Sequence, residues 1–162
     1  MTEDDITELA RKAGRACKRR KVEIVTAESC TGGGLAAAMT RISGSAKYFD
    51  RGFVTYANAA KRQMLGVSQR TLKRFGAVSE EVAREMALGA LKKSPSDIAI
   101  SITGIAGPTG AAPGKPVGLV WFGWAVRGGP VQTRAFHLKG GRVEVRMQSV
   151  ALALQGLIDL LR

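Results

Sequence analysis

The chain has 162 residues, 45% of them hydrophobic and 23% charged, which is the size and composition of one compact globular domain over residues 1–162. Its formal net charge of +12 favours anionic partners without identifying the anion. No apolar run reaches the roughly 18 residues of a membrane span, and two cysteines with one histidine supply neither a disulfide framework nor a metal cluster, so we expect no membrane segment and no structural metal.

The amino terminus predicts a helix over Asp4 to about Arg19, with acidic residues in its first turn and basic residues in its last. A secretory signal would begin with basic rather than acidic residues, so we expect a cytoplasmic protein. Seven cations lie in the run RKAGRACKRRK (11–21). This run is either a solvated helix face or a nucleic-acid-binding surface, and the scarcity of aromatic residues favours the solvated face.

Two strand–turn–helix units follow this helix. Val22–Val25 predicts a short strand that leads through TAESCTGGG into an alanine-rich helix over Thr31–Thr40. After a turn, Arg51–Tyr56 predicts a second strand, and Asn58 is positioned to cap a helix over Ala59–Leu65.

The second half of the chain continues the alternation and adds one hairpin. Its expected elements are a helix over Ser68–Phe75, a helix from Ser79 to about Lys93, a strand over Asp97–Ile102, a hairpin of Val117–Val126 with Val131–Leu138, and a last helix ending near Leu161. Strands that alternate with helices, together with a hairpin, predict an α/β fold: a three-layer α/β/α sandwich with a mixed central sheet.

Three of the predicted strands end in loops that are rich in polar side chains and glycine. Ligands of open α/β sheets bind beyond the carboxyl ends of the strands, so we expect these loops to form one site. The candidate residues are Glu28, Ser29, Cys30, Thr31, Gly32 and Gly33 in the first loop, Tyr56, Asn58 and Lys61 in the second, and Thr103, Gly104 and Gly107 in the third.

The first loop offers two candidate nucleophiles, Ser29 and Cys30, and the residue pattern leaves the choice between them open. A serine needs a base, and His137, the single histidine, lies in a predicted strand where a structural role is favoured. Lys61 is the alternative base, because partial burial would lower its pKa into the useful range, and Tyr56 would relay or orient the proton. The competing interpretations are a helix cap for the hydroxyl and a solvated charge for the lysine.

Backbone N–H groups from Cys30 to Gly33 are suited to hold a developing oxyanion, since the glycines leave them unobstructed. The same glycines are also compatible with simple close packing of the helix on the sheet.

Seven short motifs, in order, span nearly the whole chain: AESCTGG (27–33), GS (44–45), YANAAK with LGV (56–67), GAVSEEVA (76–83), TGIAGPTG (103–110), KPVG (115–118) and GRVEVR (141–146). In these motifs the chain resembles the nicotinamide-nucleotide amidohydrolases, or NMN deamidases, which are equivalent to the carboxy-terminal domain of competence/damage-inducible protein A. The resemblance implies deamidation of nicotinamide mononucleotide to nicotinic acid mononucleotide and ammonia in pyridine-nucleotide recycling. It implies no metal or organic cofactor, and it implies a homo-oligomer such as a dimer.

By the same resemblance, Ser29 is the nucleophile, Lys61 the base and Tyr56 an assisting group, and Gly44 and Ser45 join the expected substrate-binding residues. The phosphate of such a substrate needs cationic or N–H donors away from the amide. Arg142 and Arg146 share one helix face and are candidates for this role, with a surface pair as the alternative interpretation. The helix start at the glycines is the other candidate, and we assign it provisionally to the oxyanion. A nucleic-acid-binding module and an inactive partner-binding domain remain the alternatives to an enzyme.

Overall fold

A computed structural model describes all residues, 1–162. One mixed sheet runs through the centre, in the order β2-β1-β3-β4-β5. The strands are β1 (Ile24–Glu28), β2 (Phe49–Val54), β3 (Ile98–Gly104), β4 (Leu119–Val126) and β5 (Val131–His137). β1 is parallel to both of its neighbours, while β4 is antiparallel to β3 and to β5. The predicted hairpin is the β4–β5 pair.

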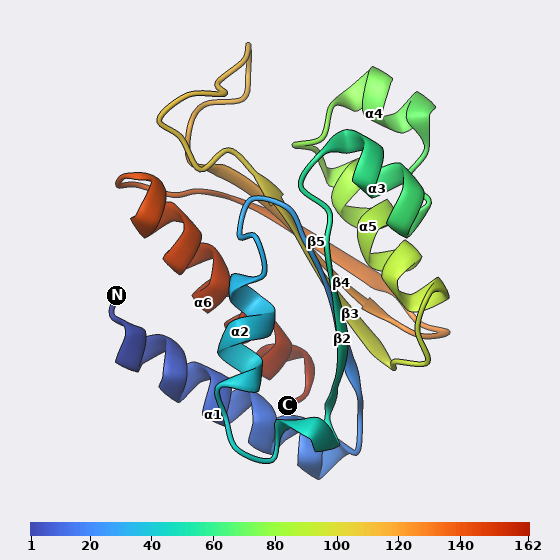
Figure 1. The fold of residues 1–162 in the computed structure, drawn as a ribbon, viewed down its shortest axis with the longest axis vertical. Coiled ribbons are helices and arrows are strands. Elements are labelled where there is room, and N and C mark those ends of the chain that lie inside the picture. The colour runs from blue at the N-terminus through green and yellow to red at the C-terminus, as the bar shows by residue number, and fades with distance from the viewer.

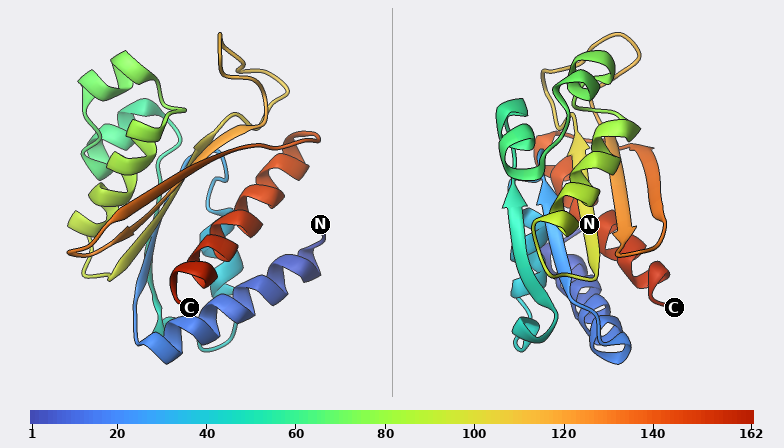
Figure 2. Two further views of the ribbon diagram at one scale, coloured as in Figure 1. Left: turned by 180° about the vertical axis from the view of Figure 1, so that it is seen from behind. Right: turned by 90° about the vertical axis from the view of Figure 1, so that its right-hand side faces the viewer.

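Helices cover both faces of this sheet (Figure 1 and Figure 2). One layer contains α1 (Glu3–Arg20), α2 (Gly34–Thr40) and α6 (Arg142–Leu160), and the other contains α3 (Asn58–Leu65), α4 (Gln69–Phe75) and α5 (Glu80–Lys92). A short 3₁₀ turn, η1 (Ser45–Lys47), precedes β2. Each layer closes its own apolar core against the sheet, which is why β1 and β3 are apolar on both faces. The predicted three-layer α/β/α sandwich with a mixed sheet is confirmed.

The structure shifts several predicted boundaries. β1 starts at Ile24 rather than at residue 22 and continues to Glu28, so that the nucleophile loop leaves the strand directly. α2 begins at Gly34 rather than at Thr31, because Gly32 and Gly33 adopt φ values of 57° and 99°, which a right-handed helix excludes. The predicted capping role of Asn58 is wrong: the residue is the first of α3, and the cap position belongs to Ala57.

The carboxyl ends of β2, β1 and β3 meet at one edge of the sheet. Glu28 at the end of β1 lies opposite Val54 on one side and Ile102 on the other. The ladder extends one residue further, since Ser29 N–H donates to the Ile102 carbonyl at 3.0 Å and Thr55 N–H donates to the Glu28 carbonyl at 2.7 Å. The three polar loops therefore start side by side, with the loop after β1 in the middle.

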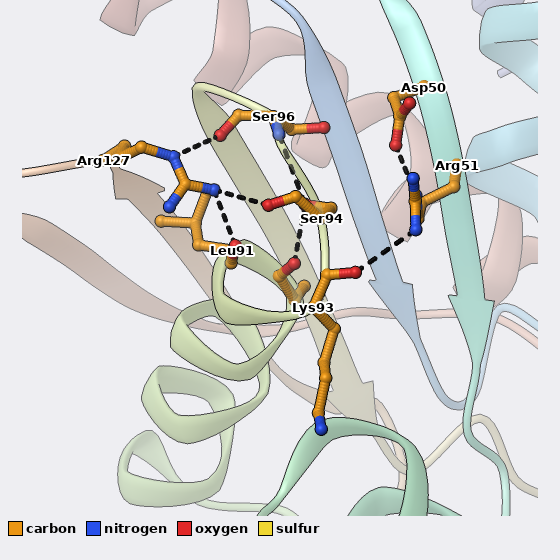
Figure 3. Close-up of polar contacts among 8 residues, drawn as sticks. Asp50, Arg51, Leu91, Lys93, Ser94, Ser96 and Arg127 are labelled. Atoms are coloured by element: carbon orange, nitrogen blue, oxygen red, sulfur yellow. Dashed lines mark hydrogen bonds and ion pairs between the residues drawn. The ribbon is translucent and has the colours of Figure 1, made fainter.

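An arginine closes the opposite end of the α5 layer (Figure 3). Arg127 follows β4 and donates hydrogen bonds to the carbonyls of Leu91 at 2.6 Å, Ser94 at 2.8 Å and Ser96 at 2.8 Å. A cation at the end of a helix satisfies carbonyls that have no partner within the helix. Arg127 therefore ties the end of α5 and the turn before β3 to the β4–β5 hairpin.

Candidate active site

Ser29 and Lys61 meet where the β1 and β2 loops converge. Lys61 Nζ lies 2.9 Å from Ser29 Oγ, although 32 residues separate the two along the chain. Ser29 is the first residue beyond β1, and Lys61 lies in the first turns of α3, which follows β2. The expected juxtaposition of a hydroxyl and an amine from two different strand exits is present.

The amine of Lys61 is withdrawn from water. The residue is 1% exposed, and its Nζ also donates to the Tyr56 carbonyl at 2.9 Å. Burial lowers the pKa of Lys61 from 10.5 to about 8, because removal from water disfavours the ammonium form. Lys61 Nζ donates both to the Tyr56 carbonyl and to Ser29 Oγ, and the Ser29 hydroxyl lies 3.5 Å from the same carbonyl. Loss of one proton from the ammonium leaves a lone pair on the nitrogen that contacts Ser29 Oγ, so the amine can accept the hydroxyl proton.

The side chain of Tyr56 contacts neither Ser29 nor Lys61. It is 60% exposed, and its hydroxyl accepts a hydrogen bond from Arg142 Nη2 at 3.1 Å. The second amino group of Arg142 donates to the Gly107 carbonyl at 2.8 Å. Tyr56 therefore contributes its backbone carbonyl beside the Ser29–Lys61 pair, and its phenol joins Arg142 in a bridge towards the third loop.

Cys30 is placed differently from its neighbour Ser29. Its thiol is buried and forms no hydrogen bond to Lys61, and burial raises the pKa of the Cys30 thiol to about 11. A thiol with so high a pKa stays protonated near neutral pH and is a poor nucleophile. Of the two candidates that the pattern left open, only Ser29 has a side chain that hydrogen-bonds to a basic group.

Glu28 organises the turn that carries Ser29. The side chain is fully buried, and its carboxylate accepts hydrogen bonds from Thr31 Oγ1 at 2.6 Å, Leu35 N–H at 2.9 Å and Ala36 N–H at 3.0 Å. These contacts satisfy the first turn of α2, which begins without a side-chain cap from Gly33. The Glu28 carboxylate therefore stabilises the loop from the protein interior and does not line the cavity.

A cavity of about 320 Å³ opens beside the Ser29–Lys61 pair. This volume lies at the lower end of the range for small-molecule sites. Among the predicted site residues, those lining it are Ser29, Cys30, Tyr56, Asn58, Lys61, Thr103, Gly104, Gly107 and Arg142. All three polar loops and the first turn of α6 therefore contribute to one cavity.

Seven predicted substrate-binding residues do not line this cavity: Glu28, Thr31, Gly32, Gly33, Gly44, Ser45 and Arg146. Gly44 and Ser45 precede β2, at the amino end of a strand whose carboxyl end carries the site, and so lie at the opposite edge of the sheet. Arg146 lies behind the Ser29 turn, where Nε donates to the Cys30 carbonyl at 3.1 Å and Nη2 to the Thr31 carbonyl at 3.2 Å.

The sequence analysis missed the remaining lining residues, which are mostly small or apolar: Ala77, Val78, Ile105, Ala106, Thr109 and Gly110. They belong to two quoted motifs, GAVSEEVA and TGIAGPTG, and their place in those motifs is the signal that marks them. Together with the polar residues named above, they give the cavity a mixed lining, in which 6 of the 15 residues are hydrophobic.

The basic run of α1 is exposed and contributes nothing to the cavity. Arg11 and Arg15 approach Glu8 at 2.6 and 3.7 Å. Arg20 Nη1 donates to the Leu161 carbonyl at 3.1 Å, and Lys18 Nζ lies 5.9 Å from the centre of the Tyr48 ring. No group of three or more His, Cys, Asp and Glu side chains is arranged to hold a metal ion. None of the helices combines the length and apolar character needed to cross a membrane.

The fold and the site define the class of protein: an α/β sandwich with a buried serine–lysine pair at the carboxyl edge of its parallel strands. A family model described as CinA, the CinA C-terminal domain, matches residues 6–161, and the chain belongs to this family.

Curated relatives cover almost the same length. Proteins named nicotinamide-nucleotide amidohydrolase PncC are 51% identical over 157 residues in Escherichia coli strain K12 (97% of this chain, 95% of the relative) and 50% identical over 155 residues in Enterobacter agglomerans (96% and 94%). The protein of that name from Pseudomonas putida is 45% identical over 157 residues (97% and 98%).

Solved structures agree with the fold. The crystal structure of competence/damage inducible protein CihA from Agrobacterium tumefaciens superimposes with a TM-score of 0.94 at 48% identity, covering 98% of this chain and 96% of that chain. A CinA superfamily protein from Klebsiella pneumoniae gives 0.93 at 41% identity, with coverage of 96% and 97%. The family expected from the motifs is confirmed.

Proposed function

We propose that this protein is an amidohydrolase that deamidates nicotinamide mononucleotide to nicotinic acid mononucleotide and ammonia. The observation that carries the proposal is the 2.9 Å contact between Lys61 Nζ and Ser29 Oγ at the wall of the cavity, with burial holding the pKa of the lysine at about 8. The relatives named nicotinamide-nucleotide amidohydrolase supply the substrate class.

In the first half-reaction, Ser29 Oγ attacks the carboxamide carbon while Lys61 Nζ takes the hydroxyl proton. The carbonyl oxygen becomes an oxyanion, for which the Cys30 N–H is suited because Cys30 lines the cavity next to Ser29 and its N–H donates to no backbone group of the protein. Lys61 then passes its proton to the amide nitrogen, the carbon–nitrogen bond breaks, and ammonia leaves. An ester between Ser29 and the pyridine carboxyl group remains.

In the second half-reaction, water attacks this ester in the same geometry. Lys61 removes a proton from the water and returns it to Ser29 Oγ as the carbon–oxygen bond breaks, which releases the carboxylic acid and restores both side chains. One base serves both steps because the attacking water takes the position that ammonia has left, so that the second half-reaction reverses the first with water in place of ammonia.

The proposed role of Tyr56 is carried by two different groups of the residue. Its carbonyl orients the Lys61 amine, and its phenol supports Arg142 at the cavity. Arg142 is the candidate for the phosphate, since its guanidinium is exposed and lines the same cavity as the Ser29–Lys61 pair. Arg146 points at backbone carbonyls instead, so we do not carry its phosphate role forward.

The test measures ammonia release from nicotinamide mononucleotide by the wild type and by Ser29→Ala, Lys61→Ala and Cys30→Ala. We expect no detectable turnover without the serine and a loss of roughly 10²- to 10⁴-fold without the base. Cys30→Ala should stay within a few fold of the wild type. Full activity of both Ser29→Ala and Lys61→Ala would disprove the mechanism.

The role in pyridine-nucleotide recycling, the cytoplasmic location and the homo-oligomeric state belong to this proposal as well. They follow from the family resemblance and from the sequence rather than from the geometry of the site. Light scattering of the purified protein measures the oligomeric state directly, and a monomeric mass would remove that part of the proposal.

A further inference from the structure

We propose that Arg146 is a positioning residue, which holds the carbonyls of Cys30 and Thr31 and so fixes the turn that carries the Cys30 N–H, the proposed oxyanion donor, beside Ser29. The inference rests on the proposed amide hydrolysis and assigns Arg146 a role other than contact with substrate.

Backbone hydrogen bonds within the turn from Ser29 to Gly34 leave the Cys30 carbonyl without a backbone donor. Gly32 N–H donates to the Ser29 carbonyl at 3.0 Å, and Gly34 N–H donates to the Thr31 carbonyl at 3.0 Å. The Cys30 carbonyl has no backbone donor, and its hydrogen bond comes from Arg146 Nε at 3.1 Å. A side chain from α6, more than a hundred residues away, therefore completes the turn.

These contacts fix the direction of two peptide units. In a trans peptide the N–H and the C=O point to opposite sides. The Ser29 carbonyl is held by Gly32, which sets the direction of the Cys30 N–H, and the Cys30 carbonyl is held by Arg146, which sets the direction of the Thr31 N–H. Neither of these two N–H groups donates to a backbone group of the protein, and of the two residues Cys30 lines the cavity.

The guanidinium fits this place closely. Nε and Nη2 reach two successive carbonyls, those of Cys30 and Thr31, as the fixed fork of an arginine allows and a single ammonium does not. A Cβ at position 32 would lie 3.3 Å from Arg146 Nη2, so glycine leaves the room that the guanidinium occupies. Val145, the preceding residue of α6, is fully buried and anchors this turn of the helix in the core.

Misplacing an oxyanion donor affects the transition state more than the bound substrate. The donor is aimed at charge that develops only during the reaction, and loss of one such donor lowers kcat roughly 10²- to 10³-fold. Arg146 acts through the turn rather than on the oxyanion itself, so a smaller loss follows. We expect Arg146→Gln to lower kcat by about 10- to 100-fold and to change KM by less than about threefold.

Arg127 provides the matched control. It also donates to several backbone carbonyls, those of Leu91, Ser94 and Ser96, but at the opposite end of the α5 layer (Figure 3). Arg127→Gln removes at least as many hydrogen bonds from the fold without touching the Ser29 turn. It should lower the midpoint of urea unfolding while kcat stays within about twofold of the wild type.

The experiment measures kcat and KM for nicotinamide mononucleotide, and the urea midpoint, in the wild type, Arg146→Gln, Arg146→Lys and Arg127→Gln. We expect Arg146→Lys to recover part of kcat, since one ammonium replaces one of the two contacts. Far-ultraviolet circular dichroism checks folding, and Arg146→Lys alone decides the question if Arg146→Gln does not fold.

Three outcomes would overturn the inference: an unchanged kcat, a rise in KM at constant kcat, or an equal loss of kcat in Arg127→Gln. The second outcome would return Arg146 to substrate binding. A wild type that releases no ammonia would instead reject the proposed function, so the two failures are distinguishable.

Discussion

Burial of Lys61 predicts a specific pH dependence of the reaction. Only the neutral amine accepts the Ser29 proton, and its pKa of about 8 makes it about 10% neutral at pH 7, half neutral at pH 8 and about 90% neutral at pH 9. Since the lowered pKa favours the active form, kcat/KM rises with pH. We expect a rise of about tenfold between pH 7 and pH 9, followed by a plateau.

The shape of the pH profile of kcat/KM distinguishes a buried Lys61 from a lysine in contact with solvent. A side chain with the ordinary pKa of 10.5 would gain about tenfold for every pH unit up to pH 9 and beyond, which amounts to about a hundredfold between pH 7 and pH 9 without a plateau. The assay is initial-rate ammonia release at substrate concentrations far below KM, in buffers of constant ionic strength. A logarithmic slope of one that continues past pH 9.5 would refute the assignment of the base.

Two variants serve as controls for the titrating group. His137 is the single histidine and belongs to β5, and His137→Gln removes the side-chain type that ordinarily titrates near neutral pH. Cys30→Ala removes the thiol in the cavity, whose pKa of about 11 lies above the expected bend. Both variants should keep the bend near pH 8. If the bend in the pH profile disappears in either variant, the substituted residue is the group that titrates.

Three further predictions follow from the same contacts. The pKa of Lys61 is 10.5 in the unfolded chain and about 8 in the folded chain, so this group makes the folded protein more stable as pH rises. Relative to Lys61→Met, the free energy of unfolding of the wild type in urea should increase by about 1 kcal/mol between pH 7 and pH 9. An equal pH dependence of the two proteins would contradict the pKa shift. Arg142→Ala should raise KM for nicotinamide mononucleotide at least about tenfold but leave KM for nicotinamide riboside, which has no phosphate, within about threefold, and equal effects on both substrates would exclude a phosphate contact. Gly89→Ala should raise the pH at which kcat/KM levels off, because a Cβ at Gly89 collides with the Leu65 carbonyl and pushes α3, which carries Lys61, away from α5. A stable, folded variant whose kcat/KM still levels off near pH 8 would show that this packing does not set the pKa of Lys61.

The convergence of the loops that carry Ser29 and Lys61 could be predicted because it depends on topology, whereas the choice of Ser29 over Cys30 came from the family resemblance. Parallel neighbouring strands end at the same edge, so polar residues just beyond β1 and β2 must converge. The same rule explains the failure for Gly44 and Ser45. They follow α2, which returns from the carboxyl edge to the amino edge before β2 starts, so that one helix length separates them from the site.

The roles of Tyr56 and Arg146 could not be predicted from spacing. A sequence does not state whether a residue meets its neighbour through the side chain or through the carbonyl, and Tyr56 uses the carbonyl towards Lys61. Arg142 and Arg146 are four residues apart on one helix face. One turn of helix nevertheless places the Arg142 guanidinium at the cavity and the Arg146 guanidinium against the backbone of the Ser29 turn. Both distinctions depend on tertiary packing.

One structural feature accounts for both the reactivity of Lys61 and its effect on stability. Moving its pKa from 10.5 to about 8 destabilises the folded protein by about 3 kcal/mol at pH 7, a large fraction of the stability of a small domain. Gly89 lets α5 approach Leu65 at the end of α3, the helix that carries Lys61, and a glycine inside a helix costs about 1 kcal/mol. A merely structural lysine would be replaced by an apolar residue without these penalties. The buried Lys61 and the helical Gly89 both destabilise the fold, and both are consistent with the requirement that an amine beside Ser29 be neutral near physiological pH.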